Sequence, residues 1–441
     1  MRCGGRVLAG VALTLLAGAV AACGRHHVPK SGGELVVQSF QMTDPQVGWA
    51  VWHAAKGNGA AIFRTTDGGA HWARVFRATR IAATDFLDST HAWVLGSLGP
   101  FVIAERTSDG GASWQGITNP PDPQSEPLET ESLNFVTPEV GWVALCVGYD
   151  SLRDNLLLDQ TTDGGNSWTV VPFQPIPPGG GPGDSAVFTV NGPHHPLELT
   201  SQGCGDSAID FLDSEHGVLS YGGGIARTSD GGRIWTTVAL PPFMGFDGAS
   251  VNEVARVGAA TVVARWVLPA AGGSTSAAVP TRGREAKCPG RTVPATVPPP
   301  QNVDTLASHR CSVLLDRPLC EEFVISGDGG QHWQESRIFA AGPHASYSFL
   351  PSGEGWVAVG DSYLYHTTDA GQSWQVLALG GVAAGRVVTG VQFLSSSLGW
   401  AVLAGMGGCG PTGSILAKTT DGGQSWVTVD PAFGLAAPHQ S

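Results

Sequence analysis

An eight-residue motif occurs seven times in this chain of 441 residues, and it constrains the fold more than any other feature. Its pattern is Ser/Thr-x-Asp-Gly/Ala-Gly-x-x-Trp, and we call it the box. A motif repeated every 40 or more residues, with short apolar runs between the copies, is typical of a β-propeller or a solenoid. The boxes are Thr65–Trp72, Thr107–Trp114, Thr161–Trp168, Thr228–Trp235, Ser326–Trp333, Thr367–Trp374 and Thr419–Trp426.

Each box residue suits a tight turn. Asp and Ser/Thr side chains accept hydrogen bonds from nearby backbone N–H groups, and Gly tolerates positive φ. The Trp opens the next strand with a large apolar surface. A catalytic or calcium-binding role is disfavoured, because no second carboxylate recurs beside the box. We therefore interpret the seven aspartates as structural: Asp67, Asp109, Asp163, Asp230, Asp328, Asp369 and Asp421.

A second motif precedes six of the seven boxes. An apolar run ending in Phe, a turn rich in Asp, Pro and Ser, and then Gly-Trp with another apolar run indicate a β-hairpin. Of the 14 tryptophans, only Trp52 and Trp266 lie outside these two motifs. The copies are Phe40–Trp49, Phe86–Trp93, Phe135–Trp142, Phe211–Val218, Phe349–Trp356 and Phe393–Trp400.

Residues 205–240 give the clearest repeat. They predict four strands, which are Ser207–Leu212, Gly217–Tyr221, Ile225–Thr228 and Trp235–Leu240. Four short strands per repeat make one propeller blade. We therefore predict an all-β, seven-bladed propeller of four-stranded antiparallel blades over residues 34–430, with one box per blade. The fifth repeat lacks the hairpin motif, and its first strands are predicted at Ser250–Val257 and Thr261–Leu268.

This assignment places the loops on two faces. Turns between the first and second strands share one face with the boxes, and the other face carries longer, variable loops. The longest is an irregular insertion at 269–319 in the fifth blade, and a second lies at Pro172–Gly203, while 431–441 is predicted to be a C-terminal tail. Because variable loops on a rigid scaffold usually carry binding residues, we expect the functional surface on that variable face.

The N-terminus predicts export. Arg2 and Arg6 precede the apolar run Val7–Val20, which is short for a membrane span. Val20-Ala-Ala-Cys23 resembles a bacterial lipoprotein cleavage site, so residues 1–22 are a predicted signal peptide, Cys23 a lipidated residue and 23–33 a tether. The alternative is an ordinary secretory signal. We expect a lipid-anchored protein on the extracytoplasmic side of the cell membrane.

Charge and cysteine usage agree with an exported protein. The formal net charge is −13, which disfavours nucleic acid as a partner. Six cysteines follow Cys23, an even number that favours disulfides. We predict a Cys146–Cys204 pair, and the remaining four allow three pairings: Cys288, Cys311, Cys320 and Cys409.

The boxes resemble the Asp-box (BNR) repeats of sialidases, of sortilin-type receptors and of the photosystem II stability and assembly factor family. The last resemblance is the closest, through Gly413-Ser-Ile415-Leu-Ala-Lys418-Thr419 and Gly224-Ile225-Ala-Arg227-Thr228. It covers residues 34–430 and implies a propeller scaffold that assists assembly of a membrane complex.

The residue before the box is basic in five repeats. One hypothesis is a basic ring that contacts an acidic partner. The alternative is a set of solvated strand residues paired with local carboxylates, each pair contributing about 0–1 kcal/mol. The five are Arg64, Arg106, Arg227, His366 and Lys418, and the other two repeats have Gln160 and Ile325.

Two classes of function remain open. The first is a non-enzymatic protein-binding or assembly scaffold, monomeric, whose partner is another exported or membrane protein. The second is a glycoside hydrolase, sialidase-like or glucanase-like, with its site on the variable face. A sialidase needs an arginine cluster and a Tyr nucleophile, and a glucanase needs two facing carboxylates. The long loop offers only Glu285, Asp304 and Asp316.

No motif for a cofactor, nucleotide or metal is present. The histidine pairs His26-His27 and His194-His195 are isolated, and the cysteine spacing does not match a zinc site. We therefore predict no cofactor and no metal.

Overall fold

The computed structural model describes the strands and most of the tight turns. The described residues are 35–54, 59–98, 101–120, 129–150, 153–171, 197–199, 208–221, 224–238, 250–256, 261–269, 319–335, 339–341, 345–359, 363–383, 386–407, 410–430 and 433. All of them belong to one compact unit, Ser31–Ser441. Within these ranges, no helix is long and apolar enough to span a membrane.

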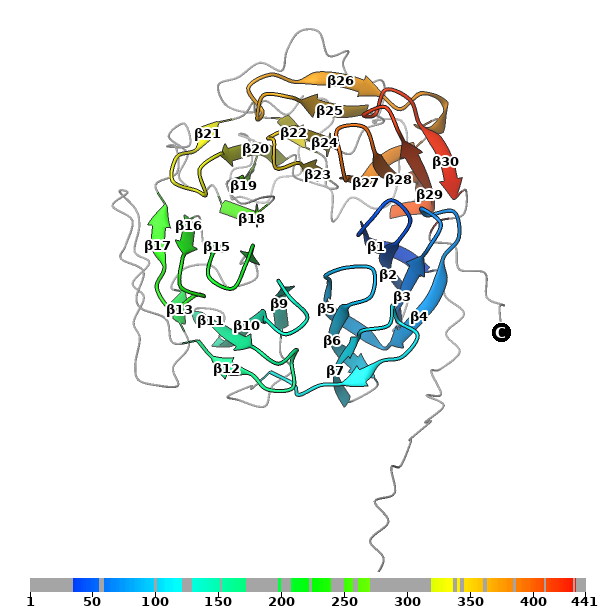
Figure 1. Ribbon diagram of the computed structural model, residues 1–441. Helices are drawn as coiled ribbons and strands as arrows, with labels where there is room; N and C mark the ends of the chain where they lie inside the picture. Colours follow the sequence, from blue (N-terminus) through cyan, green and yellow to red (C-terminus); the bar gives the residue numbers. More distant parts are fainter. Residues whose placement is uncertain are drawn as a thin grey trace, which may run out of the picture. The chain divides into compact units, whose positions relative to one another are not determined.

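The strands form seven antiparallel sheets, which we call sheets A to G in chain order (Figure 1). Sheet A contains β1 (Leu35–Met42), β2 (Gly48–Ala54), β3 (Ala60–Thr65) and β4 (Ala73–Ala78). Sheet B contains β5 (Arg80–Phe86), β6 (Ala92–Leu98), β7 (Phe101–Thr107) and β8 (Gln115–Gly116). Sheet C contains β9 (Glu129–Phe135), β10 (Gly141–Asp150), β11 (Arg153–Thr161), β12 (Thr169–Val170) and β13 (Leu197–Leu199).

The remaining sheets follow the same order. Sheet D contains β14 (Ala208–Phe211), β15 (Gly217–Tyr221), β16 (Gly224–Thr228) and β17 (Thr236–Val238). Sheet E contains β18 (Ser250–Arg256), β19 (Val262–Pro269), β20 (Leu319–Ser326), β21 (Gln334–Glu335) and β22 (Phe339–Ala341). Sheet F contains β23 (Ala345–Phe349), β24 (Gly355–Val359), β25 (Tyr363–Thr367) and β26 (Gln375–Ala378). The 3-10 turn η3 (Gly380–Ala383) leads to sheet G, with β27 (Arg386–Phe393), β28 (Gly399–Gly407), β29 (Gly410–Thr419) and β30 (Val427–Asp430).

The predicted fold class is wrong in its uniform four-stranded blades, because sheets C and E each contain a fifth strand. In both sheets the third strand is longer than the short fourth strand that pairs with it. β11 pairs with β12 only at Asp159–Gln160, and β13 pairs with its other end. β21 and β22 divide the edge of β20 in the same way. The added strands supply backbone partners that an exposed edge would otherwise lack.

Contacts between neighbouring sheets arrange them as the ring of a β-propeller. β3 contacts β5, β5 contacts β9, β9 contacts β14, β14 contacts β18, β22 contacts β24, β23 contacts β27, and β27 contacts β1. The first strands therefore lie innermost. The strands predicted for residues 205–240 are confirmed as β14 to β17, and those predicted for the fifth repeat are confirmed as β18 and β19, with small differences at the ends.

The boxes form identical turns. In all seven, the Thr/Ser hydroxyl donates to Asp Oδ1 at 2.8–2.9 Å. The same hydroxyl accepts the N–H of the second glycine at 2.7–3.0 Å. Asp Oδ1 also accepts the N–H of the seventh box residue at 2.8–2.9 Å. These bonds explain why every copy needs a hydroxyl and a carboxylate two residues apart.

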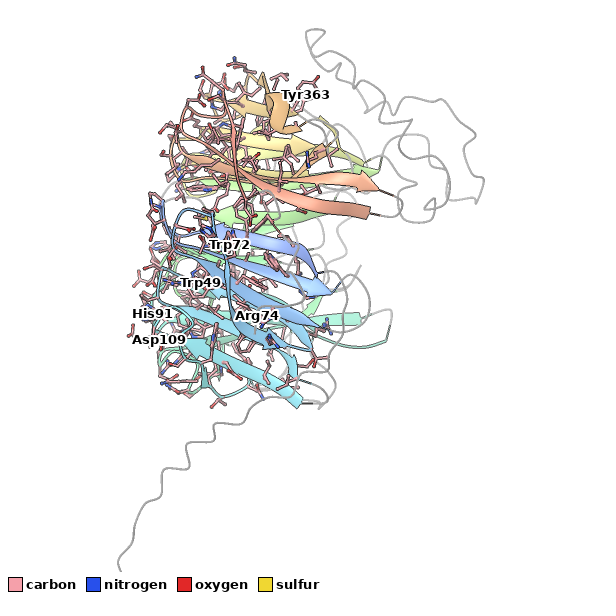
Figure 2. All side chains as sticks on the ribbon, turned by 90° about the vertical axis from the view of Figure 1, so that its right-hand side faces the viewer. Trp49, Trp72, Arg74, His91, Asp109 and Tyr363 are labelled. Atoms are coloured by element: carbon pink, nitrogen blue, oxygen red, sulfur yellow. The ribbon has the colours of Figure 1, made fainter. Side chains whose placement is uncertain are left out.

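The two motifs lie at the same face of the ring. His91, in the hairpin turn of sheet B, and Asp109, in its box, are neighbours at one edge of the molecule (Figure 2). The Gly110 N–H donates to the Thr90 carbonyl at 2.9 Å and joins the two turns. We call this side the box face, and its position agrees with the predicted sorting of the turns.

Aromatic side chains join consecutive sheets. Trp93 of sheet B stacks on Phe135 of sheet C with ring centroids 3.7 Å apart, and Trp142 stacks on Phe211 of sheet D at 3.8 Å. The same tryptophans donate Nε1–H to a box glycine carbonyl of the next sheet: Trp93 to Gly164, Trp142 to Gly231, Trp356 to Gly422 and Trp400 to Gly68. Trp93, Trp142 and Trp356, which stacks on Phe393, therefore bind the next sheet by both stacking and a hydrogen bond, whereas Trp400 contributes the hydrogen bond.

Polar side chains form a second set of contacts at the innermost strands. The residue before the hairpin Phe or Met reaches the backbone of the next sheet. The Phe135 N–H donates to Asp85, the Phe211 N–H to Asn134, the Phe393 N–H to Ser348 and the Met42 N–H to Gln392. Gln41 instead donates to the Phe86 carbonyl. These bonds satisfy edge groups of the inner strands that no strand of the same sheet can reach.

Sheets G and A close the ring without exchanging a strand, because every sheet is contiguous in sequence. Gln392 accepts the Met42 N–H at 2.6 Å and donates to its carbonyl at 3.0 Å. Phe433 is fully buried against Trp52, at a centroid distance of 5.8 Å. Phe433 falls within the predicted C-terminal tail, so this residue belongs to the packed core instead.

The indole hydrogen bond is testable with two buried tryptophans. Trp142→Phe removes the donor to Gly231 and leaves that carbonyl buried without its partner, whereas Trp52 Nε1 is buried with no hydrogen-bond partner. We expect Trp142→Phe to lower the free energy of unfolding by on the order of 2–4 kcal/mol, and Trp52→Phe to cost about 1 kcal/mol less. Urea denaturation of the two variants checks this difference. Equal losses would contradict a role for the indole N–H.

A second prediction concerns pH. Desolvation raises the pKa of Asp85 to about 7, although the Phe135 N–H opposes the shift; the Asp210 carboxylate adds to it. The folded protein therefore holds a proton, between pH 3.8 and about 7, that the unfolded chain has lost. The stability that this carboxyl contributes is complete at acid pH and is lost as the pH rises through 7.

Asp85→Asn keeps the acceptor for Phe135 and removes the charge, as Asn134 does in the next sheet. We expect the variant to be more stable than the wild type at pH 8 by on the order of 1–4 kcal/mol, and nearly equal to it at pH 4. The matched Asn134→Asp variant should show the opposite trend. Urea unfolding at several pH values measures both, and an unchanged pH slope for Asp85→Asn would contradict the assignment.

Candidate functional site

The residue before each box lies directly across the sheet from the residue that follows the hairpin glycine. Register pairs Trp49 with Arg64 in sheet A and Trp93 with Arg106 in sheet B. The same pairing joins Trp356 to His366 and Trp400 to Lys418. In sheet D the partner of Arg227 is Val218, and in sheet E the pair is Val263 with Ile325. Each residue of the predicted basic ring is therefore one partner of a cross-strand pair.

Four of the five basic residues are engaged between or within sheets. Arg64 lies over Trp49, 5.4 Å from the ring centroid, and donates to the Ser89 carbonyl at 2.8 Å. Arg106 donates to the Gly164 carbonyl at 3.1 Å. Lys418 lies 4.9 Å from the Trp400 centroid, and His366 stacks on Trp356 and contacts Glu354 at 2.9 Å. Their contacts favour a structural role, worth about 0.5–2 kcal/mol for each cation over an aromatic face.

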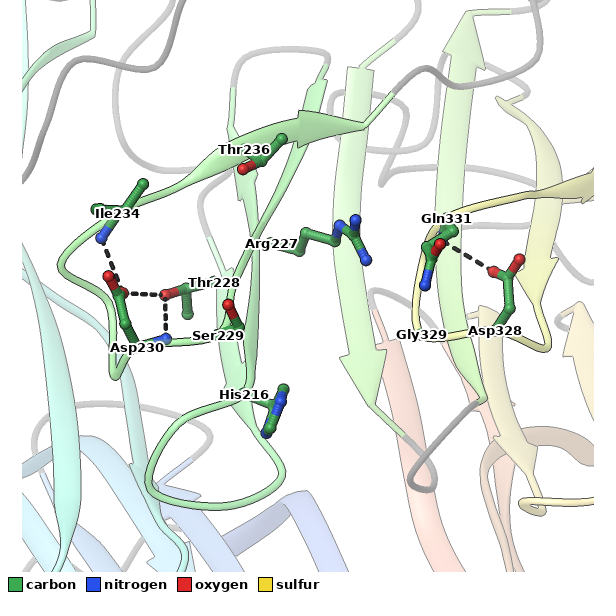
Figure 3. A pocket seen from close by; sticks show the side chains of 10 residues that line it. All are labelled: His216, Arg227, Thr228, Ser229, Asp230, Ile234, Thr236, Asp328, Gly329 and Gln331. Carbon is green, nitrogen blue, oxygen red and sulfur yellow. Dashed lines mark hydrogen bonds between the residues drawn. The ribbon is translucent and has the colours of Figure 1, made fainter.

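Arg227 differs from the other four. It is half-buried, it faces no tryptophan across the sheet, and its guanidinium makes no hydrogen bond or ion pair with any described residue. Figure 3 shows its side chain extending from β16 towards the box of sheet E. An arginine has five N–H donors in a planar fork. Arg227 is thus the basic position whose donors are available to another molecule.

Arg227 lies in a pocket of about 560 Å³ between sheets D and E on the box face (Figure 3). A volume in this range holds a small ligand or one or two side chains of a partner. Sheet D contributes Arg227, the box residues from Thr228 to Asp230, Ile234 and Thr236, together with His216 of the hairpin turn. The box of sheet E contributes Asp328, Gly329 and Gln331.

The two carboxylates of the pocket serve their own turns. Burial alone would raise the pKa of Asp230, but hydrogen bonds from the Ile234 N–H and the Thr228 hydroxyl leave it lowered. The His332 N–H and imidazole hold the pKa of Asp328 well below its usual range. Both groups are therefore ionised at neutral pH and already accept several hydrogen bonds. Neither suits the proton-donor role that glycoside hydrolysis requires.

Among the described residues, two carboxyls have raised pKa values, but neither is at the pocket. Desolvation raises the pKa of Asp159 to about 7, and both of its oxygens are buried without a hydrogen-bond partner. Its side chain is fully enclosed in sheet C, so it cannot meet a substrate. Asp85 lies on the innermost strand of sheet B and accepts the Phe135 N–H. These two carboxyls therefore give no support to an active site.

Several sequence-based predictions lie outside the described residues. They include the lipidation site Cys23, the cysteines Cys204, Cys288, Cys311 and Cys409, and the loop carboxylates Glu285, Asp304 and Asp316. Cys146 and Cys320 lie in β10 and β20, and their side chains are not described. Most of both insertions, which the sequence predicts on the variable face, also lies outside these ranges, whereas the pocket lies on the box face. Within the described ranges, no group of three His, Cys, Asp or Glu residues could hold a metal.

The pocket was missed in the sequence, although a signal for it was present. Val218 is the only copy of the hairpin motif in which the final position is not Trp, and the following repeat lacks the motif altogether. Read together, these two departures mark the interface between sheets D and E.

Comparison with family models and with curated proteins finds no match. Among solved structures, the chain is similar to YCF48 bound to a D1 peptide, with 15% identity, 88% of this chain and 94% of that chain covered, and a TM-score of 0.48. It is similar to YCF48 from Cyanidioschyzon merolae, with 15% identity, coverage of 81% and 86%, and a TM-score of 0.42. It is also similar to a GH74 xyloglucanase from Xanthomonas campestris, with 15% identity, coverage of 90% and 64%, and a TM-score of 0.30.

Proposed function

We propose that this protein is an exported, lipid-anchored propeller that binds a segment of another exported or membrane protein without catalysing a reaction. The pocket between sheets D and E is the proposed contact site. The observation that carries the proposal is Arg227, whose guanidinium is directed into the pocket without a partner among the described residues. Arginine is enriched where protein surfaces bind, because one side chain supplies both donors and a flat stacking face.

Support also comes from what the other basic positions do. Arg64 and Arg106 donate to backbone carbonyls of the next sheet, so the same position contributes to the ring at those interfaces. At sheet D, Arg227 makes no such bond. Because Arg227 does not hold two sheets together, it can bind a partner without a loss of folding stability.

The binding proposal is tested with a photo-cross-linking amino acid at Ser229, which is exposed at the pocket edge. In cells that express the full chain, we expect one cross-linked protein partner, and we expect Arg227→Ala to reduce its yield by roughly tenfold. Because Arg227 makes no described bond, the variant should unfold at the wild-type urea concentration.

Two controls sharpen this test. Arg77→Ala removes the same charge from an exposed position on β4 and should leave cross-linking unchanged. A cross-linker at Ser396, exposed in the hairpin turn of sheet G, should not capture the partner. Equal capture at both positions, or turnover of chromogenic sialosides or β-glucans by the purified protein, would refute the proposal.

Membrane attachment is proposed to depend on lipid at Cys23. The apolar run Val7–Val20 followed by Val-Ala-Ala-Cys motivates this assignment. We expect Cys23→Ala to move the protein from the membrane to the soluble fraction, or to leave it unprocessed with residues 1–22 attached. Mass spectrometry and membrane fractionation measure these outcomes. If the variant keeps the wild-type mass and membrane partitioning, the anchor is not at Cys23.

A further inference from the structure

The interface between sheets D and E lacks a group that recurs at four other interfaces. Four tryptophans, of sheets B, C, F and G, donate Nε1–H to a box glycine of the next sheet. The corresponding residue of sheet D is Val218, and the corresponding glycine of sheet E is Gly329. Among described residues, no donor to the Gly329 carbonyl is found, and Gly329 lines the pocket. The pocket therefore includes the place where an indole lies at those four interfaces.

A second contact is missing at the same interface. In five boxes, the second glycine lies against an apolar side chain of the preceding sheet: Leu416 at Gly69, Val75 at Gly111, Ile117 at Gly165, Leu158 at Gly232 and Leu377 at Gly423. At Gly330 of sheet E, the one described side chain found at this place is Trp333 of its own box. Among the described residues, the box of sheet E therefore receives neither of these contacts from sheet D, which leaves the Gly329–Gly330 side of the pocket open to an apolar group.

Arg227 occupies the position of the cations that cover the tryptophans elsewhere. Arg64 lies over Trp49, Lys418 over Trp400, and His366 is stacked on Trp356. Each of these basic side chains is the cross-strand partner of the ring that it covers. Arg227 has the same register position with no ring beside it. The pocket thus contains the cation and the carbonyl acceptor of an indole site, without the indole.

We propose that the partner protein inserts a tryptophan side chain into this pocket, between Arg227 and the box of sheet E. This inference rests on the proposed binding function and specifies its chemistry. The guanidinium covers the face of the indole, and the indole N–H donates to the Gly329 carbonyl. Such an arrangement repeats between two proteins the contacts that join sheets within this one.

Charge favours a neutral aromatic group over an anion. Asp230 and Asp328 are both ionised and both line the pocket near Arg227. An entering carboxylate would gain from Arg227 but would meet these two like charges. An indole has no net charge, and its ring edge is positive, so it suits a site with one cation and two carboxylates.

The test uses N-acetyl-5-fluorotryptophanamide as the probe and follows its fluorine NMR signal. We expect the full-length protein to broaden and shift this signal in a saturable way. N-acetylleucinamide and N-acetylaspartate amide should compete at least roughly tenfold less well than unlabelled N-acetyltryptophanamide. Equal competition by the leucine amide, or preference for the aspartate derivative, would overturn the assignment to an aromatic ligand.

Val218→Trp supplies the missing indole from within the chain. We expect this variant to fold with at least wild-type thermal stability and to weaken probe binding by roughly tenfold or more, because the site is already filled. Ser395→Trp adds a tryptophan at an exposed turn of sheet G and should leave probe binding unchanged. If Val218→Trp fails to fold, Arg227→Ala provides the second variant, with a several-fold loss of probe binding expected.

Cross-linking at Ser229 separates the two proposals. If the partner is captured in an Arg227-dependent way but the probe does not bind, the tryptophan assignment is wrong and the binding function stands. If the probe binds but no protein is captured, the pocket accepts an indole from a small molecule and the proposed function is wrong. Partner capture that survives a well-folded Val218→Trp variant also refutes the tryptophan assignment.

Discussion

The hydrogen bond between the box hydroxyl and its aspartate supports the rest of the structure. It closes the turn, and in closing it the hydroxyl also accepts the second glycine N–H. The turn then presents the carbonyl of the preceding glycine at a defined place on the sheet edge. Trp142 of the preceding sheet donates to that carbonyl and stacks on the nearby Phe211. A local turn thus determines how two sheets that are distant in sequence approach each other.

The same dependence explains how a repeated fold acquires one distinct site. Because each interface needs contributions from two consecutive repeats, a change in one residue affects only the interface it faces. Val218 alters the D–E interface and leaves the C–D interface intact, where Trp142 and Leu158 still contact the box of sheet D. The repeat can therefore carry a binding pocket at one position while its neighbours maintain the ring.

Much of the fold could be predicted from the sequence because both motifs act locally. The turns at Asp213 and at Asp230 set the ends of β15 and β16, so these strands were predicted to within one residue. β13 and β22 were missed, because three residues paired with an extended strand leave no local pattern. Ala370 was also unremarkable in the sequence, although its φ of 56° makes it the non-glycine residue with positive φ among those described.

The candidate site was less predictable, since it depends on which residues of two neighbouring sheets face each other across their interface. Asn134 and Gln392 read as ordinary polar residues before a Phe, and only their register reveals that they bind the next sheet. Arg227 belongs to a pattern of five basic residues, and the pattern alone does not say which one lacks a ring beside it. The expected functional face was chosen from loop length, whereas the pocket arises from a missing side chain between two regular sheets.

The contiguity of every sheet has a consequence for the order in which the chain folds. A sheet that borrows no strand from a distant segment can form as soon as its own residues are free to fold, and each new sheet can dock on the one before it. The exception is the junction between sheets A and G, because Met42 and Trp52 contact Gln392 and Phe433, which lie near the other end of the chain. Until sheet G has formed, the growing propeller is an open arc whose two end sheets each lack a neighbour, and those apolar faces are the surfaces most exposed to misassembly.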